Sequence, residues 1–392
     1  MSEPLSLDAI TALEAGLGEE ERAARDSVRR WVRDRFLPRI TAAHREGSFP
    51  QELVPELAEL GLFGANLQGY GCAGMSNVAY ALVLQELERG DSGLRSLCSV
   101  QGSLVMYAIL AFGDDEQRAR WLPELARGRL LGCFGLTEPG AGSDPNSMRC
   151  TARRDGEAWV LDGIKAWITS APVADLAVVW ARVPEQGGRI RGFVVERGTP
   201  GFSTPAVEGK FSLRASPTGE LHLSDCRVPA ANLLPGSNGL KSPLACLTQA
   251  RFGIGCSVLG AAVDCFETVQ RHGLERVQFG KPLAAFQLYQ AQLAEMASAI
   301  VGGQVLALHY ARLKDAGQLT HVQVSLLKRG NVRIARDVAR SARAMLGAIG
   351  ITDAYPVIRH MMNLESVYTY EGTHEVHTLA LGRALTGIEA FA

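Results

Sequence analysis

An excess of charge of one sign, a long apolar run and paired cysteines are all missing from this sequence of 392 residues. Its 40 Lys and Arg residues are matched by 41 Asp and Glu residues, which gives a net charge of −1. A protein that binds a phosphate backbone needs an excess of positive charge, so nucleic acid is not an expected partner. No uninterrupted apolar run reaches the roughly 18 to 20 residues that span a bilayer. We therefore expect a soluble protein without a membrane partner.

The eight cysteines form no Cys-x-x-Cys pair and no spacing typical of a zinc site. We expect them to be buried thiols in a reducing compartment, and we expect no metal site. Acidic residues occur early, at Glu3 and Asp8, which is typical of neither a secretory signal nor a transit peptide. The sequence therefore predicts a cytoplasmic protein.

The order of the hydrophobic patterns predicts three regions. Apolar residues recur at helical spacing from about 8 to 129, and short runs rich in Val, Ile and aromatic residues follow from about 131 to 235. Helical spacing then returns from 243 to 385, with room for four or five long helices. Because the predicted strands are grouped together between two helical regions, alternating βαβ units and a Rossmann fold are disfavoured. The predicted class is therefore α+β. The expected domains are 1–130, 131–240 and 241–392.

Two segments of the middle region could border a ligand. Residues 132–145 contain glycines and prolines that force an irregular backbone, where Thr137 and Ser143 could meet a polar group; a simple tight turn is the alternative. The phosphate-loop pattern Gly-x-x-x-x-Gly-Lys-Ser/Thr is absent. In residues 162–171, Trp167 could cover one face of a planar ring, or it could be an ordinary core tryptophan.

Near the C-terminus, Glu371 lies between Tyr370 and Gly372, at an expected break between two helices. A carboxylate held there against apolar surface would have its pKa raised toward neutrality, which suits a general base. The alternative is a solvated glutamate in a loop. The His374-x-x-His377 pair is weak evidence for a metal, so ordinary helix histidines are expected.

Taken together, these motifs resemble those of the acyl-CoA dehydrogenase family. The residues that carry the resemblance are Leu-Thr-Glu-Pro (136–139), Lys-Ala-Trp-Ile-Thr (165–169), Arg-Val-Gln-Phe-Gly-Lys-Pro-Leu (276–283) and Tyr-Glu-Gly-Thr (370–373). Residues 86–96, 209–216 and 370–374 resemble the glutaryl-CoA dehydrogenase branch of that family. The resemblance implies an N-terminal helical domain, a middle β domain and a C-terminal four-helix bundle, assembled as a homotetramer.

The resemblance also implies a reaction. Glu371 would remove the proton alpha to the thioester of glutaryl-CoA while a hydride leaves the beta carbon for FAD, and an electron-transfer flavoprotein would reoxidise the cofactor. Arg95 and Ser96 would bind the distal carboxylate. Glu88 and Tyr370 would assist protonation after carbon dioxide leaves, which gives crotonyl-CoA. The substrate would further contact Ser143, Arg251 and Gly372.

The family also implies the residues that hold FAD. The isoalloxazine would lie between Phe134, Leu136 and Thr137 on one side and Trp167, Ile168 and Thr169 on the other. The pyrophosphate and adenosine would be held by Arg276, Phe279, Gln287, Thr373 and Phe391, with Ala344, Met345, Leu346, Gly347 and Ala348 of a neighbouring subunit. The chain departs from the usual pattern at Ala348, where the family has glycine, and at Leu94, where the branch often has an aromatic residue.

Two other functions stay open on the sequence. One is a dehydrogenase that oxidises glutaryl-CoA or a substituted succinyl-CoA without decarboxylation. The other is an inactive, flavin-free relative that acts as a binding protein. The presence of Glu371, Arg95 and Thr137 together argues against the second.

Overall fold

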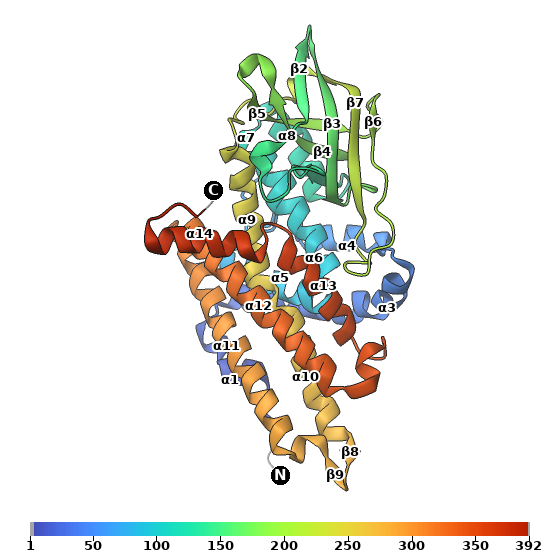
Figure 1. The fold of residues 1–392 in the computed structure, drawn as a ribbon, viewed down its shortest axis with the longest axis vertical. Coiled ribbons are helices and arrows are strands. Elements are labelled where there is room, and N and C mark those ends of the chain that lie inside the picture. Colours follow the sequence, from blue (N-terminus) through green and yellow to red (C-terminus); the bar gives the residue numbers. More distant parts are fainter. Residues whose placement is uncertain (1–3, 391–392) are drawn as a thin grey trace.

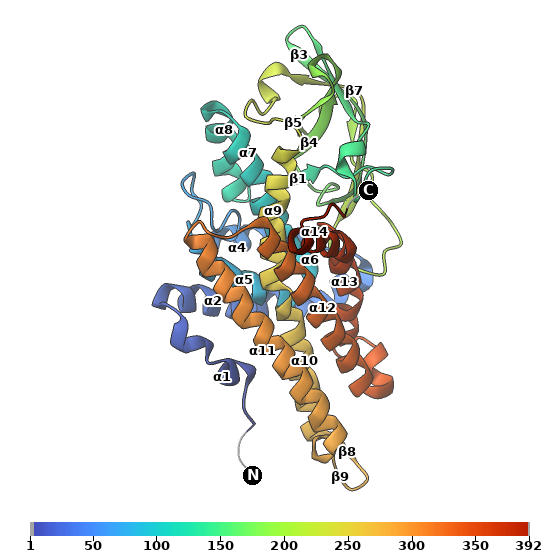
Figure 2. The same cartoon turned by 60° about the vertical axis from the view of Figure 1, so that its left-hand side comes forward.

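In the computed structural model, which describes residues 4–390, a β domain lies at one end of a long helical body (Figure 1). The N-terminal and C-terminal helices pack side by side below the sheet, although the β domain separates them in the sequence (Figures 1 and 2). The order of helices, strands and helices confirms the predicted α+β class.

The N-terminal region is helical throughout. Its α-helices are α1 (Leu7–Thr11), α2 (Glu19–Trp31), α3 (Leu37–Glu46), α4 (Val54–Glu59), α5 (Asn77–Gly90), α6 (Ser92–Ser99), α7 (Tyr107–Phe112) and α8 (Asp115–Ala126). Ser76 starts α5, because its hydroxyl accepts a hydrogen bond from the Ala79 N–H at 3.0 Å. Asp91 ends α5 and starts α6, since its carboxylate accepts from the Gly93 N–H at 2.7 Å. Helix α6 continues without interruption into a π-helical stretch, Val100–Met106.

The β domain is a mixed sheet with the order β1-β4-β2-β3-β7-β6, and β5 pairs with β4. Its strands are β1 (Gly132–Gly135), β2 (Thr151–Asp155), β3 (Ala158–Thr169), β4 (Leu176–Val183), β5 (Arg189–Glu196), β6 (Phe202–Ser203) and β7 (Thr218–Pro229). Strands β1 and β4 are parallel, whereas β3 and β7 form a long antiparallel pair. That pair is interrupted by a bulge between Lys165 and Ile168, which matters for the site below.

The C-terminal region contains six α-helices. They are α9 (Lys241–Ser257), α10 (Leu259–Glu275), α11 (Gln287–Asp315), α12 (His321–Met345), α13 (Val357–Thr369) and α14 (His374–Thr386). A small hairpin, β8 (Val277–Gln278) and β9 (Lys281–Pro282), interrupts the predicted helical pattern between α10 and α11. It was not predicted, because strands of two residues carry no readable periodicity. In both views the hairpin lies at the end of the molecule away from the sheet (Figures 1 and 2).

By length and composition, three helical stretches are apolar enough to cross a membrane. Two of them, Ser92–Phe112 and Lys241–Glu275, are 78% and 89% buried within the protein, which accounts for their apolar character as core packing. The third, Gln287–Asp315, is only 28% buried, so helix α11 exposes much of an apolar helix in the isolated chain.

Candidate active site

The turn between α13 and α14 carries Glu371 in an unusual backbone conformation. Glu371 has a φ of +55° and the following Gly372 has a φ of +88°. The left-handed region costs a non-glycine residue about 1–2 kcal/mol, so a glutamate stays there only when its surroundings hold it. Thr373 closes the turn, because its hydroxyl accepts from the Val376 N–H at 3.2 Å and caps α14.

A buried lysine lies under this turn. Lys328, on α12, is only 1% exposed. Its Nζ donates hydrogen bonds to the carbonyl of Tyr370 and, at 2.5 Å, to the carbonyl of Gly372. Burial lowers the pKa of Lys328 to about 7. The two carbonyls that flank Glu371 are therefore satisfied by one ammonium group.

The carbonyl of Glu371 itself is held from two other helices. Arg251 of α9 donates from Nε at 2.8 Å, and His377 of α14 lies with Nε2 at 3.2 Å. Burial, together with the positive charges of Lys328 and Arg251, lowers the pKa of His377 to about 3. The imidazole is therefore neutral and donates its Nε2–H to the carbonyl.

The Glu371 carboxyl group meets the requirement for a general base. Its Oε2 is buried and has no hydrogen-bond partner among the described residues. Burial raises the pKa of Glu371 above its ordinary value. The positive charges of Arg251, Lys328 and Arg95 lower the pKa of Glu371 and so favour its ionised form. The predicted alternative of a solvated loop glutamate does not describe this environment.

A second buried cluster faces the same turn from α5 and α6. Arg95 is 2% exposed, donates from Nε to Glu88 at 2.7 Å and donates from Nη2 to the Tyr370 hydroxyl at 2.5 Å. Ser92 also donates to Glu88, at 2.6 Å. Although burial works against its charge, Tyr370 and Glu88 hold the pKa of Arg95 well above the usual range. Within the described part of the chain, Arg95 makes its hydrogen bonds through Nε and Nη2, which leaves Nη1 without a partner there.

Helix α13, which leads into the Glu371 turn, is tied to this cluster. Asp91 accepts hydrogen bonds from Arg359 at 2.6 Å and from Asn363 at 2.9 Å, and all three side chains are buried. Asn363 also accepts from the Leu213 N–H at 2.8 Å, so the loop 209–216 of the β domain lies against the same helix. The segment 209–216, noted for its resemblance, thus helps to fix where the turn lies.

Hydrogen bonds from strand β3 hold the loop that follows β1. The Lys165 Nζ donates to the Leu136 carbonyl at 3.1 Å and to Glu138 at 2.8 Å, and Ala166 donates its N–H to the Thr137 carbonyl at 2.9 Å. Thr137 is partly exposed at the mouth of this loop. A side chain built at Gly142 would meet nothing within 4 Å, so open space lies in front of the loop.

Trp167 is not a core tryptophan, which was the alternative on the sequence. It lies in the β3 bulge with a φ of +62°, and 66% of it is exposed. A bulky residue in the left-handed region is a true outlier. The bulge therefore exposes a flat aromatic ring beside the Thr137 loop. A planar ligand would need such an exposed ring to stack on.

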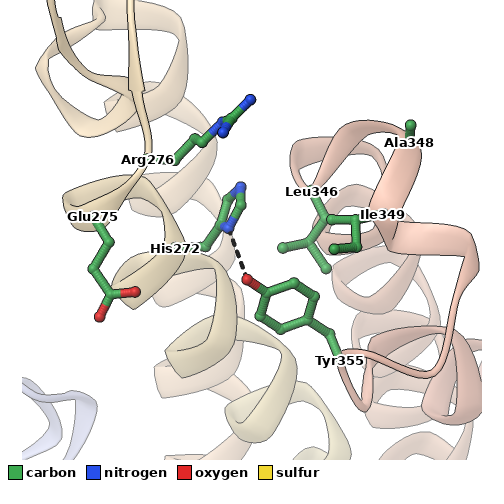
Figure 3. Close-up of a pocket in the computed structure, with 7 residues that line it drawn as sticks. All are labelled: His272, Glu275, Arg276, Leu346, Ala348, Ile349 and Tyr355. Atoms are coloured by element: carbon green, nitrogen blue, oxygen red, sulfur yellow. Dashed lines mark hydrogen bonds between the residues drawn. The ribbon is translucent and has the colours of Figure 1, made fainter.

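Of the residues predicted to hold pyrophosphate and adenosine, Thr373 lies in the Glu371 turn, whereas Arg276, Phe279 and Gln287 lie elsewhere. Arg276 lines a cavity of about 500 Å³ together with Leu346 and Ala348 of the same chain (Figure 3). Phe279 lies in the nearby hairpin and is 94% exposed, and Gln287 is exposed at the start of α11. One chain therefore does not bring these residues to the sheet that carries Trp167.

The remaining predicted residues are placed as follows. Phe134, Leu136 and Ile168 are buried in or beside the sheet, Thr169 and Met345 are partly buried, and Ala344, Gly347 and Ser143 are exposed. Ser96 is buried beside Tyr370, and Leu94 is fully buried in α6. Phe391 lies outside the described residues. No group of three His, Cys, Asp or Glu side chains within residues 4–390 could hold a metal ion.

Lys328 was not predicted from the sequence to belong to the site, and His377 was expected to be an ordinary helix histidine. A signal for Lys328 was present. It falls on the apolar face of α12, one helical turn after Val324 and before Val332, and a charged residue at such a position is rarely left buried without a partner.

Comparison with known proteins identifies the relatives of this chain. Models of the acyl-CoA dehydrogenase N-terminal, middle and C-terminal domains match residues 18–129, 133–226 and 237–386. A glutaryl-CoA dehydrogenase from Mycobacterium smegmatis is 54% identical, with a TM-score of 0.97 over 99% of this chain and 100% of the other. A second one from that organism, solved in complex with FADH2, is 47% identical with the same TM-score and coverage. The rat short-chain specific acyl-CoA dehydrogenase is 33% identical over 370 residues, 93% of this chain and 90% of its own length. These matches confirm the resemblance that the motifs predicted.

Proposed function

The chain belongs to the acyl-CoA dehydrogenase family, and from this premise we propose that it oxidises and decarboxylates glutaryl-CoA to crotonyl-CoA and carbon dioxide. The observation that carries the proposal is the pair formed by Glu371 and Arg95. A buried carboxyl group with an unpartnered oxygen lies in the same site as a buried guanidinium that has an unused Nη1. The first suits proton removal, and the second suits a carboxylate.

The charges of the site favour a substrate with a negative tail. Within residues 4–390, the cations Arg95, Arg251 and Lys328 face two carboxylates, Glu88 and Glu371. A distal carboxylate placed at Arg95 would balance this excess, whereas a plain acyl chain would leave the guanidinium with an unused donor in a desolvated pocket. The glutaryl group has this carboxylate.

FAD fits the residues that the structure displays. The exposed Trp167 ring and the pinned loop at Thr137 border open space at the end of the sheet. When bound, FAD would accept the hydride from C3 of the acyl group. Glu371 would take the proton from C2, so that one proton and one hydride leave together and no free carbanion accumulates. After carbon dioxide departs, Tyr370 and Glu88 would assist protonation at C4 to give crotonyl-CoA.

The proposal includes a homotetramer in the cytoplasm, with no membrane partner, and an electron-transfer flavoprotein as the acceptor. One observation supports assembly. The β8–β9 hairpin lies at the end of the chain away from the sheet (Figures 1 and 2). Arg276 directly precedes this hairpin and Phe279 is within it, whereas Trp167 is in strand β3 of the sheet. A flavin bound at Trp167 could therefore reach such residues only on a second copy.

Product analysis tests the proposed reaction. Purified protein incubated with glutaryl-CoA and an artificial electron acceptor should release carbon dioxide and crotonyl-CoA in equal amounts. The thioesters are measured by chromatography, and the carbon dioxide is captured and quantified. Accumulation of glutaconyl-CoA as the end product would instead support the non-decarboxylating enzyme. A purified protein without the absorbance bands of oxidised flavin, even after incubation with FAD, would support the binding protein.

Trp167 offers a separate test of the cofactor site. The change Trp167→Ala should leave the unfolding temperature of the flavin-free protein nearly unchanged, because the ring is mostly exposed. It should weaken FAD binding by up to about tenfold, since an aromatic contact contributes about 0.5–1.5 kcal/mol. Titration of the flavin-free protein with FAD measures this. Trp159→Phe, a buried change in the same strand, is the matched control and should reduce stability without affecting FAD affinity.

A further inference from the structure

We propose that Lys328 is a positioning residue for the base: its ammonium group clamps the two carbonyls that flank Glu371 and holds the turn in its left-handed conformation. The inference rests on the proposed function only in that it takes Glu371 to be the base. Lys328 itself does not contact the reacting atoms in this account, because both of its hydrogen bonds go to the backbone.

The geometry of the clamp explains why a lysine is needed. The Tyr370 and Gly372 carbonyls both point to one Nζ, which approaches from α12 on the buried side of the turn. An ammonium group has three donors on a single atom and can therefore satisfy two converging carbonyls. Without it, two part-buried carbonyls would lose their hydrogen-bond partner, which is unfavourable away from water. The turn would then relax away from the conformation that Glu371 adopts at φ +55°.

The other two contacts to the turn do not replace the clamp. Arg251 and His377 both contact the carbonyl of Glu371 and leave its two neighbours to Lys328. A methyl group built at Gly372 would lie 2.9 Å from the His377 Nε2, so the turn is closely packed against α14. The turn is thus held at three successive carbonyls by four contacts, two of which come from Lys328.

The clamp also places a positive charge beside the carboxyl group. The charged and titratable groups that face Lys328 are Glu371 and Tyr370 in the turn, Arg251 on α9, Arg95 on α6 and His377 on α14. Cys246 on α9 faces Glu371. The charge of Lys328 lowers the pKa of Glu371 and thereby opposes the effect of burial. Removal of that charge should raise the pKa of Glu371, so the acid limb of the pH–rate profile should move to higher pH.

The experiment compares Lys328→Met with Lys314→Met. Lys314 is a matched control, because its Nζ is also buried and has no hydrogen-bond partner among the described residues. It lies 4.1 Å from the centre of the Phe252 ring, and its charge interacts with Cys256 and Asp315 and not with the turn. Hydrogen exchange of the FAD-loaded proteins is followed by mass spectrometry in peptides that cover residues 368–378. We expect faster exchange of these amides in Lys328→Met only, and wild-type exchange in Lys314→Met.

The second measurement is the rate of flavin reduction by glutaryl-CoA as a function of pH. Lys328→Met should be about 10- to 100-fold slower at the optimum, because small misplacement of a catalytic group costs up to about 10²-fold. Its acid limb should lie at higher pH than in the wild type, a shift that a general loss of stability does not produce. Lys328→Arg, which keeps the charge, should return the acid limb toward the wild-type position.

The two measurements, hydrogen exchange and flavin reduction, test this inference separately from the proposed function. If no thioester reduces the flavin of the wild-type protein, the proposed function is wrong, and hydrogen exchange, which needs no substrate, still decides the role of Lys328. Should Lys328→Met fail to fold, Lys328→Arg is measured in the same way, with expected exchange between wild-type and unprotected values. Unchanged exchange across residues 368–378 in the folded variant, together with an unmoved acid limb, would overturn the inference.

Discussion

Replacement of Glu371 by glutamine should leave FAD bound and slow flavin reduction by glutaryl-CoA by about 10²- to 10⁴-fold, the usual contribution of a general base. The amide keeps the shape of the side chain but cannot accept the proton. The measurement is anaerobic bleaching of the flavin absorbance after rapid mixing with substrate.

The pH dependence of the wild type provides an internal control. Because burial raises the pKa of Glu371, the base is protonated and inactive at low pH, and the rate should fall as the pH drops through that raised pKa. Glu371→Gln should lack this limb. The raised pKa also means that the ionised carboxylate opposes folding as the pH rises, so Glu371→Gln should melt no lower than the wild type at neutral pH. A variant that reduces its flavin at the wild-type rate would show that another residue is the base.

Removal of Arg95 should change which thioesters the enzyme accepts. Arg95→Met is expected to lower kcat/KM for glutaryl-CoA by about 10²- to 10³-fold, because truncation of one partner of a buried charge pair costs about 2–5 kcal/mol. Butyryl-CoA has no distal carboxylate, so its kcat/KM should fall far less. The ratio of the two values is the quantity to measure.

The Arg95→Met change also leaves Glu88 without its ion-pair partner. An unpaired buried carboxylate destabilises a protein by about 3–5 kcal/mol, so Arg95→Met alone should also melt early. The double variant Glu88→Gln/Arg95→Met removes both charges and should recover much of that stability while it keeps the altered preference. If kcat/KM falls equally for glutaryl-CoA and butyryl-CoA in the double variant, Arg95 supports the fold and does not bind the distal carboxylate of the substrate.

Sequence reasoning identified the order of the elements because long helices and short strands differ in periodicity. The sequence also indicated Glu371 as a candidate base, since Tyr-Glu-Gly-Thr places a carboxylate beside a glycine at an expected helix break. The left-handed conformations of Glu371 and Trp167 could not be predicted, because neither residue type favours positive φ. Tertiary contacts impose that conformation, through Lys328 and Arg251 in one case and the β3 bulge in the other.

The substrate-binding cluster was harder to predict in its details. Arg95 and Glu88 were expected to act separately, one on the substrate carboxylate and one on a proton. The structure pairs them at 2.7 Å and joins Arg95 to Tyr370, which is 275 residues away in the sequence. Such a pairing depends on how α5, α6 and α13 pack, and the spacing of residues within one segment contains no information about it.

The central claim is that the Glu371 carboxylate removes the C2 proton of a bound thioester. The most direct test uses 3-thiaglutaryl-CoA, in which sulfur replaces C3, so that no hydride can leave while the C2 protons and the distal carboxylate remain. In D₂O, wild-type protein should exchange the C2 protons for deuterium, detected by proton NMR, and Glu371→Gln should exchange them no faster than buffer does. Exchange by Glu371→Gln at the wild-type rate would contradict the claim.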